Sequence, residues 1–219
     1  MRELIIFGTT DAAELAHYYF TTDSNYKVVA FSVDSGYVQS NLFCGLPVIP
    51  FEEISDELTP DKHDFFIALG YSKLNQNRIH KYNATKDLGY HLASYISSHA
   101  TVLNNNIGDN CFILEDNTIQ PFVSIGNNVT LWSGNHIGHH SIIHDHCFLA
   151  SHIVVSGHVE IGEACFIGVN ATLRDHILVG ENTIIGAGAL ILSNVESGGV
   201  YVGNETERSR VPSSRLKKI

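Results

Sequence analysis

The sequence predicts a small parallel α/β sheet followed by a parallel β-helix, two architectures joined in one chain of 219 residues. Two observations carry this prediction. Strand-like and helix-like segments alternate up to about residue 93, which is typical of a parallel sheet covered by helices. Isoleucine, leucine or valine then occupies every sixth position, fifteen times without an insertion, from Ile107 to Ile191. A period of six fits neither an α-helix nor one long strand, but it fits short strands joined by turns.

Three six-residue units make one triangular coil of the predicted β-helix. Each repeated aliphatic points inward and stacks on its equivalent in the next coil, about 4.8 Å along the axis, so that fifteen units give five coils. Small or β-branched residues, Val195 among them, follow most of these aliphatics by four positions and fill the corners. Cys111, Cys147 and Cys165 occupy that corner position, and we interpret them as packing residues because the four cysteines form no CxxC pair. The repeat is expected to stop after Asn194.

The segment before the repeat carries candidates for substrate binding. We expect strands at residues 3–7, 26–33 and 64–69, and helices at residues 11–20, 50–58 and 74–87. Small parallel sheets bind ligands at the carboxyl ends of their strands. Those ends carry Gly8, Thr9, Thr10, Asp34, Gly70, Tyr71 and Lys73. An ordinary strand-to-helix turn at Gly8 and a simple cap at Asp34 remain open as alternatives.

Composition limits the possible functions. The net charge of −10 argues against a general nucleic-acid binder, which would carry a basic surface. The apolar run at the amino terminus is too short for a signal peptide, and no stretch approaches the length of a membrane span. We therefore expect a cytoplasmic protein without membrane insertion.

The order of sheet and repeat resembles a known family. Residues 135–141 read NHIGHHS, residues 156–162 read SGHVEIG, and residues 185–189 read IGAGA. Together with the uninterrupted repeat, these stretches resemble the sugar acyltransferases typified by bacillosamine and perosamine N-acetyltransferases, a group that includes the sialic acid O-acetyltransferases. The resemblance covers essentially the whole chain.

The resemblance implies the organisation of the chain. Residues 1–96 would form a Rossmann-like nucleotide-sugar-binding domain, residues 97–196 a left-handed β-helix acetyltransferase domain, and residues 197–219 a tail near CoA. It further implies a homotrimer with acetyl-CoA between neighbouring β-helices and no metal. Three aromatic residues would then point outward as candidates for contact between subunits: Phe122, Trp132 and Phe148.

The histidines between residues 136 and 158 are the candidates for catalysis. Residues eighteen apart stack on one face of a β-helix with three six-residue units per coil. His140, His158 and His176 therefore form one ladder. The adjacent ladder contains His139, Gly157 and Asp175. A base and a residue whose backbone can be approached closely thus lie on one line.

Acyl transfer to an amine needs a proton acceptor and a donor that holds the thioester oxygen as it becomes an oxyanion. An imidazole suits the first task and a glycine amide suits the second. Matched to the family motif, His139 falls on the catalytic base. The resemblance implies that the backbone N–H groups of Gly157 and Ala187 face the thioester. His136 is the main alternative base and a candidate substrate contact.

Several positions depart from the family pattern. The acidic residue that often follows the base is replaced by His140, so the base would be oriented by Asp145 or by a neighbouring subunit. The first turn also lacks the glycine-rich, histidine-containing sequence of many relatives, which weakens the assignment of nucleotide binding. Arg208 and Arg210 would either neutralise CoA phosphates or belong to a solvated basic tail.

These inferences favour an acetyl-CoA-dependent N-acetyltransferase that acts on a nucleotide-linked amino sugar. The acceptor would be a 4-amino-4,6-dideoxyhexose of a bacterial surface glycan such as the lipopolysaccharide O-antigen. Acetyl would pass directly within a ternary complex. Three alternatives stay open: O-acetylation of a sugar at the same site, a γ-carbonic-anhydrase-like zinc enzyme built on the histidine ladder, and a trimeric scaffold without catalysis.

Overall fold

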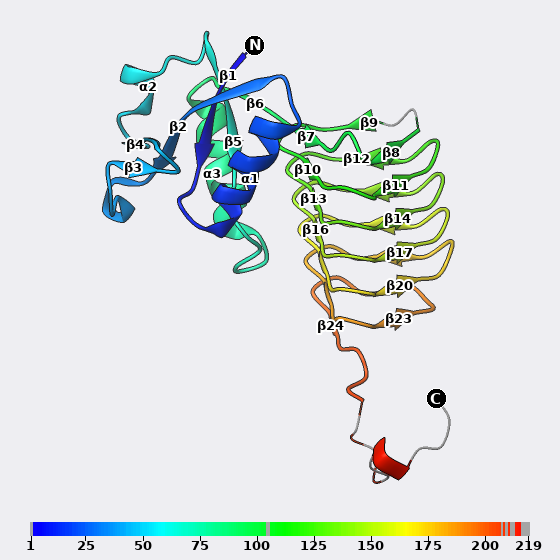
Figure 1. Ribbon diagram of the computed structural model, residues 1–219. Coiled ribbons are helices and arrows are strands. Elements are labelled where there is room, and N and C mark those ends of the chain that lie inside the picture. Colours follow the sequence, from blue (N-terminus) through cyan, green and yellow to red (C-terminus); the bar gives the residue numbers. More distant parts are fainter. Residues whose placement is uncertain (1, 104–105, 207, 209, 211–212, 216–219) are drawn as a thin grey trace.

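The computed structural model describes residues 2–103, 106–206, 208, 210 and 213–215, and it contains the two expected parts (Figure 1). The amino-terminal part is one sheet with the strand order β3–β4–β2–β1–β5–β6. Its strands are β1 (Arg2–Phe7), β2 (Tyr26–Val33), β3 (Leu42–Phe43), β4 (Leu46–Pro50), β5 (His63–Ile67) and β6 (His91–Leu92). Its helices are α1 (Asp11–Thr22), α2 (Ile54–Glu57), α3 (Gln76–Asp87) and the 3₁₀ turn Ser35–Tyr37.

The sheet is parallel except at one edge, where β3 and β4 form a hairpin. The predicted helix over residues 50–58 shortens to the single turn α2, because turns occupy the residues on its amino-terminal side. Among the described residues, none of the helices combines the length and apolar character needed to cross a bilayer.

The second part is a left-handed β-helix with three faces. The first face contains β7 (Tyr95–Ile96), β10 (Phe112–Ile113), β13 (Thr130–Leu131), β16 (Phe148–Leu149), β19 (Phe166–Ile167), β22 (Ile184–Ile185) and β24 (Val200–Tyr201). The second contains β8 (Thr101–Val102), β11 (Thr118–Ile119), β14 (His136–Ile137), β17 (Val154–Val155), β20 (Thr172–Leu173) and β23 (Leu190–Ile191). The third contains β9 (Asn106–Ile107), β12 (Ser124–Ile125), β15 (Ile142–Ile143), β18 (Glu160–Ile161) and β21 (Leu178–Val179).

The six-residue repeat forms the core as predicted. From Ile113 to Ile185 every repeated aliphatic is 0% or 1% exposed. Up to Leu173 each pairs with its equivalent eighteen residues later, as Ile119 does with Ile137. The corner cysteines are free and buried, and the Cys147 thiol lies 3.1 Å from the Gly162 carbonyl oxygen. Their packing role is therefore confirmed.

The β-helix extends beyond the regular repeat at both ends. At its start Ile96 pairs with Ile113, a spacing of seventeen residues. At its end Tyr201 pairs with Ile185, a spacing of sixteen. The six-residue repeat stops after Asn194 as expected, but the β-helix continues, and Val195 bridges to Val179 at an inward position instead of filling a corner. Coils that are one or two residues shorter than eighteen interrupt the six-residue period, but their strands still pair.

The amino-terminal part packs against the first face of the β-helix. Trp132 packs on the core of the amino-terminal sheet, and Phe148 is only 7% exposed. The Phe148 ring lies tilted against that of Tyr71, with 5.0 Å between centroids. Both side chains point away from the β-helix, but the chain's own sheet domain covers them, so the prediction that they contact another subunit is wrong. Phe122 alone of the three is exposed.

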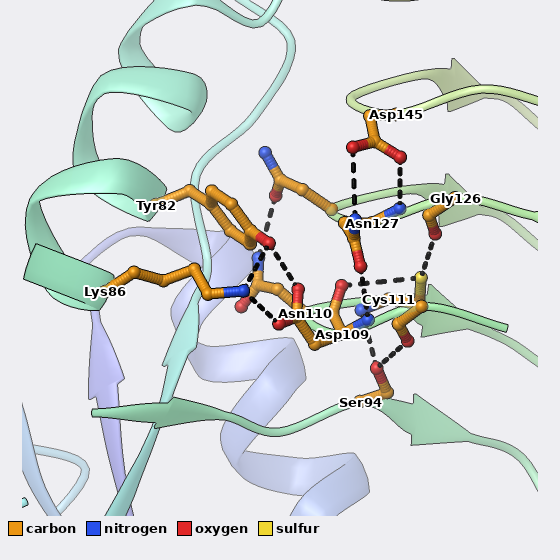
Figure 2. A network of polar contacts seen from close by, with 11 residues as sticks. Tyr82, Lys86, Ser94, Asp109, Asn110, Cys111, Gly126, Asn127 and Asp145 are labelled. Carbon is orange, nitrogen blue, oxygen red and sulfur yellow. Dashed lines mark hydrogen bonds and ion pairs between the residues drawn. The ribbon is translucent and has the colours of Figure 1, made fainter. Parts of the chain in front are cut away.

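Polar contacts join α3 to the corners of the β-helix (Figure 2). The Tyr82 hydroxyl donates to Asp109 Oδ1 over 2.5 Å, and Lys86 Nζ lies 2.6 Å from Asp109 Oδ2. In the next coils, the backbone and side-chain nitrogens of Asn127 donate to the two oxygens of Asp145 over 2.7 and 3.1 Å. This network fixes the sheet domain relative to the repeat and engages both carboxylate oxygens of Asp145.

The tight corners lead to a stability prediction. A Cβ added at Gly138 would lie 2.5 Å from the Ser156 carbonyl carbon and 2.6 Å from the Gly157 nitrogen, and these backbone atoms cannot move aside. We expect Gly138→Ala to lower the free energy of unfolding by about 2 kcal/mol or more, the upper range for overpacking. Thermal unfolding would measure it against Gly36→Ala, whose added Cβ meets nothing within 4 Å. Equal midpoints for the two variants would contradict the prediction.

Candidate active site

One corner of the β-helix, between its second and third faces, collects the predicted catalytic residues. We name it the histidine corner, and it consists of His139, His140, Gly157, His158, Asp175 and His176. Each turn at this corner has one residue in the left-handed conformation, with φ of 58° at His140, 58° at His158 and 56° at His176. Asparagine occupies comparable left-handed positions in other turns, at Asn128 and Asn182. Residues with a planar polar side chain tolerate this conformation better than β-branched ones.

The predicted ladder of stacked histidines is present. The rings of His140 and His158 lie 4.8 Å apart at 11°, and those of His158 and His176 lie 4.6 Å apart at 9°. Phe122 continues the ladder by one coil, 4.7 Å from His140. The pKa of His158 lies below its ordinary value, because partial loss of water and the neighbouring rings of His176, His140 and His139 disfavour a proton there.

The second ladder places His139 directly over Gly157. A Cβ at Gly157 would lie 2.8 Å from Cε1 and 3.0 Å from Nε2 of the His139 ring, so only glycine leaves room for this contact. In the part of the chain that the structure describes, no acceptor pairs with the Gly157 N–H. Asp175 follows in the next coil and lies 3.8 Å from His176 Nε2. An imidazole and a backbone N–H without an acceptor among the described residues are thus adjacent on an exposed corner.

His140 orients the candidate base. The His139 N–H donates to Gln120 Oε1 over 2.9 Å, and His139 Nδ1 lies 3.0 Å from His140 Nδ1. The two rings are nearly perpendicular, at 88°. Asp145, considered from the sequence for this task, lies between β15 and β16 at another corner, where Asn127 binds both its oxygens. The structure therefore contradicts that option and supplies the adjacent histidine.

A single chain does not bring together all residues that the family motif implies. Ala187 lies between β22 and β23, at the corner between the first and second faces, whereas Gly157 lies between β17 and β18. His136, the alternative base, is half-buried on β14. Arg208 and Arg210 are exposed and follow β24.

The amino-terminal candidates lie at the carboxyl end of the sheet. Gly8 has a φ of 127° and approaches Ala68 so closely that an added Cβ would lie 2.9 Å from its carbonyl oxygen. Thr9 follows half-buried, and Thr10 is the N-cap of α1. The ordinary requirement for a tight turn thus accounts for glycine at this position.

Asp34 has a partner that sequence reasoning missed. The buried Lys81 of α3 lies 2.5 Å from Asp34 Oδ1, with its ammonium 3.9 Å from the centre of the Phe51 ring. A lysine in a polar helix gives no sequence signal of such a position. Gly70 and Lys73 are exposed in the loop after β5, where Lys73 has a left-handed φ of 52°.

A cavity of about 120 Å³ lies between α1, the loop after β5 and the first face of the β-helix. Apolar side chains dominate its lining, including Phe66, Tyr71 and Trp132. The buried Arg78 also lines it and donates to the Cys147 carbonyl oxygen over 3.2 Å. No sequence signal indicated this cavity, because it depends on how the two parts pack.

Comparison with known protein families defines the structural class of the second part of the chain. A family model described as bacterial transferase hexapeptide (six repeats) matches residues 106–139 and 158–193. The second part is thus a left-handed β-helix of hexapeptide repeats. A comparison with curated protein sequences finds no significant match.

Solved structures share the whole architecture. The acetyltransferase domain of PglB from Neisseria gonorrhoeae FA1090 is 23% identical, with a TM-score of 0.83 over 93% of this chain and 97% of that one. A variant of perosamine N-acetyltransferase from Caulobacter crescentus, in complex with CoA and GDP-perosamine, is 20% identical, with a TM-score of 0.82 over 93% and 94%. WeeI from Acinetobacter baumannii AYE is 19% identical, with a TM-score of 0.70 over 93% and 97%. At these identities the likeness establishes the fold.

Proposed function

We propose that the protein is an acetyl-CoA-dependent N-acetyltransferase acting on a nucleotide-linked amino sugar. The observation that carries the proposal is His139, which lies over Gly157 on an exposed corner with His140 at its Nδ1. This pairing supplies a base and a free backbone donor side by side. The fold is shared with the PglB acetyltransferase domain, which was solved with acetyl coenzyme A, and with perosamine N-acetyltransferase, solved with CoA and GDP-perosamine.

The proposed chemistry is direct transfer. The sugar nitrogen attacks the acetyl carbon, the C–S bond breaks, and CoA leaves as the thiol. His139 accepts the ammonium proton and delivers it to the sulfur. The Gly157 N–H holds the carbonyl oxygen while it carries negative charge. Because a hydrogen bond between two ring nitrogens needs one proton, a His139 Nδ1 that donates to His140 leaves Nε2 free as the base.

The proposed assembly is a homotrimer. Gly157 and Ala187 lie at different corners of one β-helix, so one chain cannot present both N–H groups to the same thioester. A neighbouring subunit related by cyclic symmetry can bring the second corner to the first. Acetyl-CoA would then lie between two β-helices, near Arg208 and Arg210 if the tail contacts its phosphates.

The acceptor is proposed to bind at the carboxyl end of the amino-terminal sheet. Gly8, Thr10 and the Asp34–Lys81 pair stand there, and residues 1–96 would hold the nucleotide. A 4-amino-4,6-dideoxyhexose destined for a bacterial O-antigen is the acceptor that the family likeness favours. Acetyl-CoA and nucleotide-linked sugars are cytoplasmic metabolites, so we place the reaction in the cytoplasm.

Thiol release from acetyl-CoA tests the proposal. The purified protein would be offered a panel of nucleotide-linked 4-amino sugars and the corresponding 4-hydroxy sugars. We expect CoA release with at least one amino sugar and a mass increase of one acetyl group on its nitrogen. Acetylation of the hydroxy sugars alone would replace the proposal by O-acetylation. Failure of acetyl-CoA to bind at all would favour a scaffold.

Replacing the orienting histidine should slow the reaction without unfolding the corner. His140→Phe removes the nitrogen that holds His139 but keeps an aromatic ring at a left-handed position, as Phe122 has at φ 66° one coil earlier. We expect kcat to fall by between about tenfold and a hundredfold, the range for a group that orients a histidine. His140→Asp should restore part of the loss, because a carboxylate also accepts from Nδ1–H. A His140→Phe variant as fast as the parent protein would remove His140 from the mechanism.

A further inference from the structure

The histidine corner also has the composition of a metal site. His139, His140 and His158 each offer one ring nitrogen, and these three atoms lie within 4.8 Å of one another. All three side chains are exposed. Among the described residues, no ion pair joins any of the three to a carboxylate, unlike His144, which pairs with Glu160. Their nitrogens are therefore not committed to an acid.

The spacing suits a late transition-metal ion. Two nitrogens at 2.0–2.1 Å from a tetrahedral Zn²⁺ lie about 3.3 Å apart. The Nδ1 atoms of His139 and His140 are 3.0 Å apart, close to that value. Without a metal, the same two nitrogens must share one proton, which a cation can displace.

His158 can complete the set. Its ring lies 4.8 Å from that of His140 and 5.2 Å from that of His139. It stacks parallel to His140, so its ring must rotate to aim a nitrogen at the shared centre. The side chain is exposed, and no side-chain hydrogen bond holds it within the described chain, so the rotation gives up only its stacking on His140 and His176.

We propose that His139, His140 and His158 bind one divalent transition-metal ion of the Zn²⁺ class. This ion stops acetyl transfer because it takes Nδ1 of His139 and leaves the one proton of the ring on Nε2, the proposed base. Imidazole nitrogen is a preferred ligand of Zn²⁺, Ni²⁺ and Cu²⁺, whereas Mg²⁺ and Ca²⁺ prefer oxygen. The site is therefore inhibitory and selective for late transition metals. Metal binding stands on the three histidines alone, and only the inhibition rests on the proposed function.

Binding can be measured apart from activity. Metal-free protein would be titrated with Zn²⁺ by calorimetry, and with Co²⁺, whose visible absorption reports the geometry of its ligands. We expect one ion per chain for the parent protein and at least a tenfold weaker affinity for His158→Asn, because asparagine keeps the left-handed turn but removes the imidazole. The matched control is His152→Asn, which alters a turn with the same φ of 58° at another corner. Unchanged Zn²⁺ affinity in His158→Asn would overturn the site.

A second comparison guards against a folding artefact. His139→Asn should weaken Zn²⁺ binding as His158→Asn does, and both variants should keep the parent's thermal midpoint. Equal weakening in His152→Asn would show that Zn²⁺ binds to scattered surface histidines, which also overturns the proposal.

Inhibition is tested on the same variants. Zn²⁺ should suppress CoA release by the parent protein, and a chelator should restore it. His158→Asn should need at least tenfold more Zn²⁺ for half-inhibition, measured against its own metal-free rate. Binding without inhibition would overturn the inhibitory role and the assignment of His139 as base. If no sugar supports transfer, the proposed function fails, yet the binding titration still decides the metal site.

Discussion

His139→Ala should lower the kcat of acetyl transfer by at least about a hundredfold, the size of effect expected for loss of a general base. The ring is exposed, and within the described part of the chain it contacts the exposed or half-buried residues His140, His158 and Gly157, so its removal should leave the β-helix intact. The KM for acetyl-CoA should change little, because the base acts on the acceptor nitrogen. Thiol release at saturating substrates measures kcat directly.

His136→Ala is the matched comparison for this experiment, since His136 is the rival base. It lies three residues earlier on β14, half-buried between Thr118 and Val154 in the strand pairing. We expect it to retain most of the rate. A larger loss in His136→Ala than in His139→Ala, at equal thermal stability, would transfer the role of base to His136.

The strand register of the repeat could be predicted from the sequence, because one inward aliphatic in each six-residue unit is nearly sufficient to define the coils of a β-helix. From Ile113 to Ile185 that rule placed every repeated aliphatic correctly in the core. The first and last strands of the β-helix could not be predicted in this way. Ile96 pairs in parallel with Ile113, and Tyr201 with Ile185, although these spacings are one and two residues shorter than eighteen. A search for a fixed period of six misses both strands.

Residue spacing likewise predicts one part of the candidate site and not the other. The His140 ladder and the position of His139 above Gly157 follow from residue spacing, because equivalent turns of successive coils stack. The Nδ1 contact between His139 and His140 depends on side-chain rotation, and the Lys81–Asp34 pair joins distant segments, so neither follows from spacing.

The two outward aromatics show a related limit. A side chain that leaves the β-helix is exposed only if nothing else in the chain packs there. Trp132 and Phe148 lie on the one face that the amino-terminal sheet covers, and periodicity within the repeat carries no information about that contact.

Gly157→Ala should nearly abolish transfer while leaving the fold in place. The added Cβ would lie 2.8 Å from His139 Cε1, closer than real side chains approach, and the exposed imidazole is the group free to move. A shift of about 1 Å in a catalytic group can cost about a hundredfold in rate, and we expect kcat to fall by about that factor. Thermal unfolding should change much less than in Gly138→Ala, whose added Cβ meets backbone atoms.

A double variant separates displacement of the base from obstruction of the backbone donor. If Gly157→Ala acts by moving His139, then Gly157→Ala combined with His139→Ala should be about as slow as His139→Ala alone, because the displaced group is already gone. If the two losses multiply instead, the added methyl group acts independently of His139 by obstructing the approach to the N–H of residue 157, and the close contact between ring and glycine is not what sets the rate. The coupling energy between the two substitutions therefore measures how much of the rate depends on the contact between the His139 ring and Gly157.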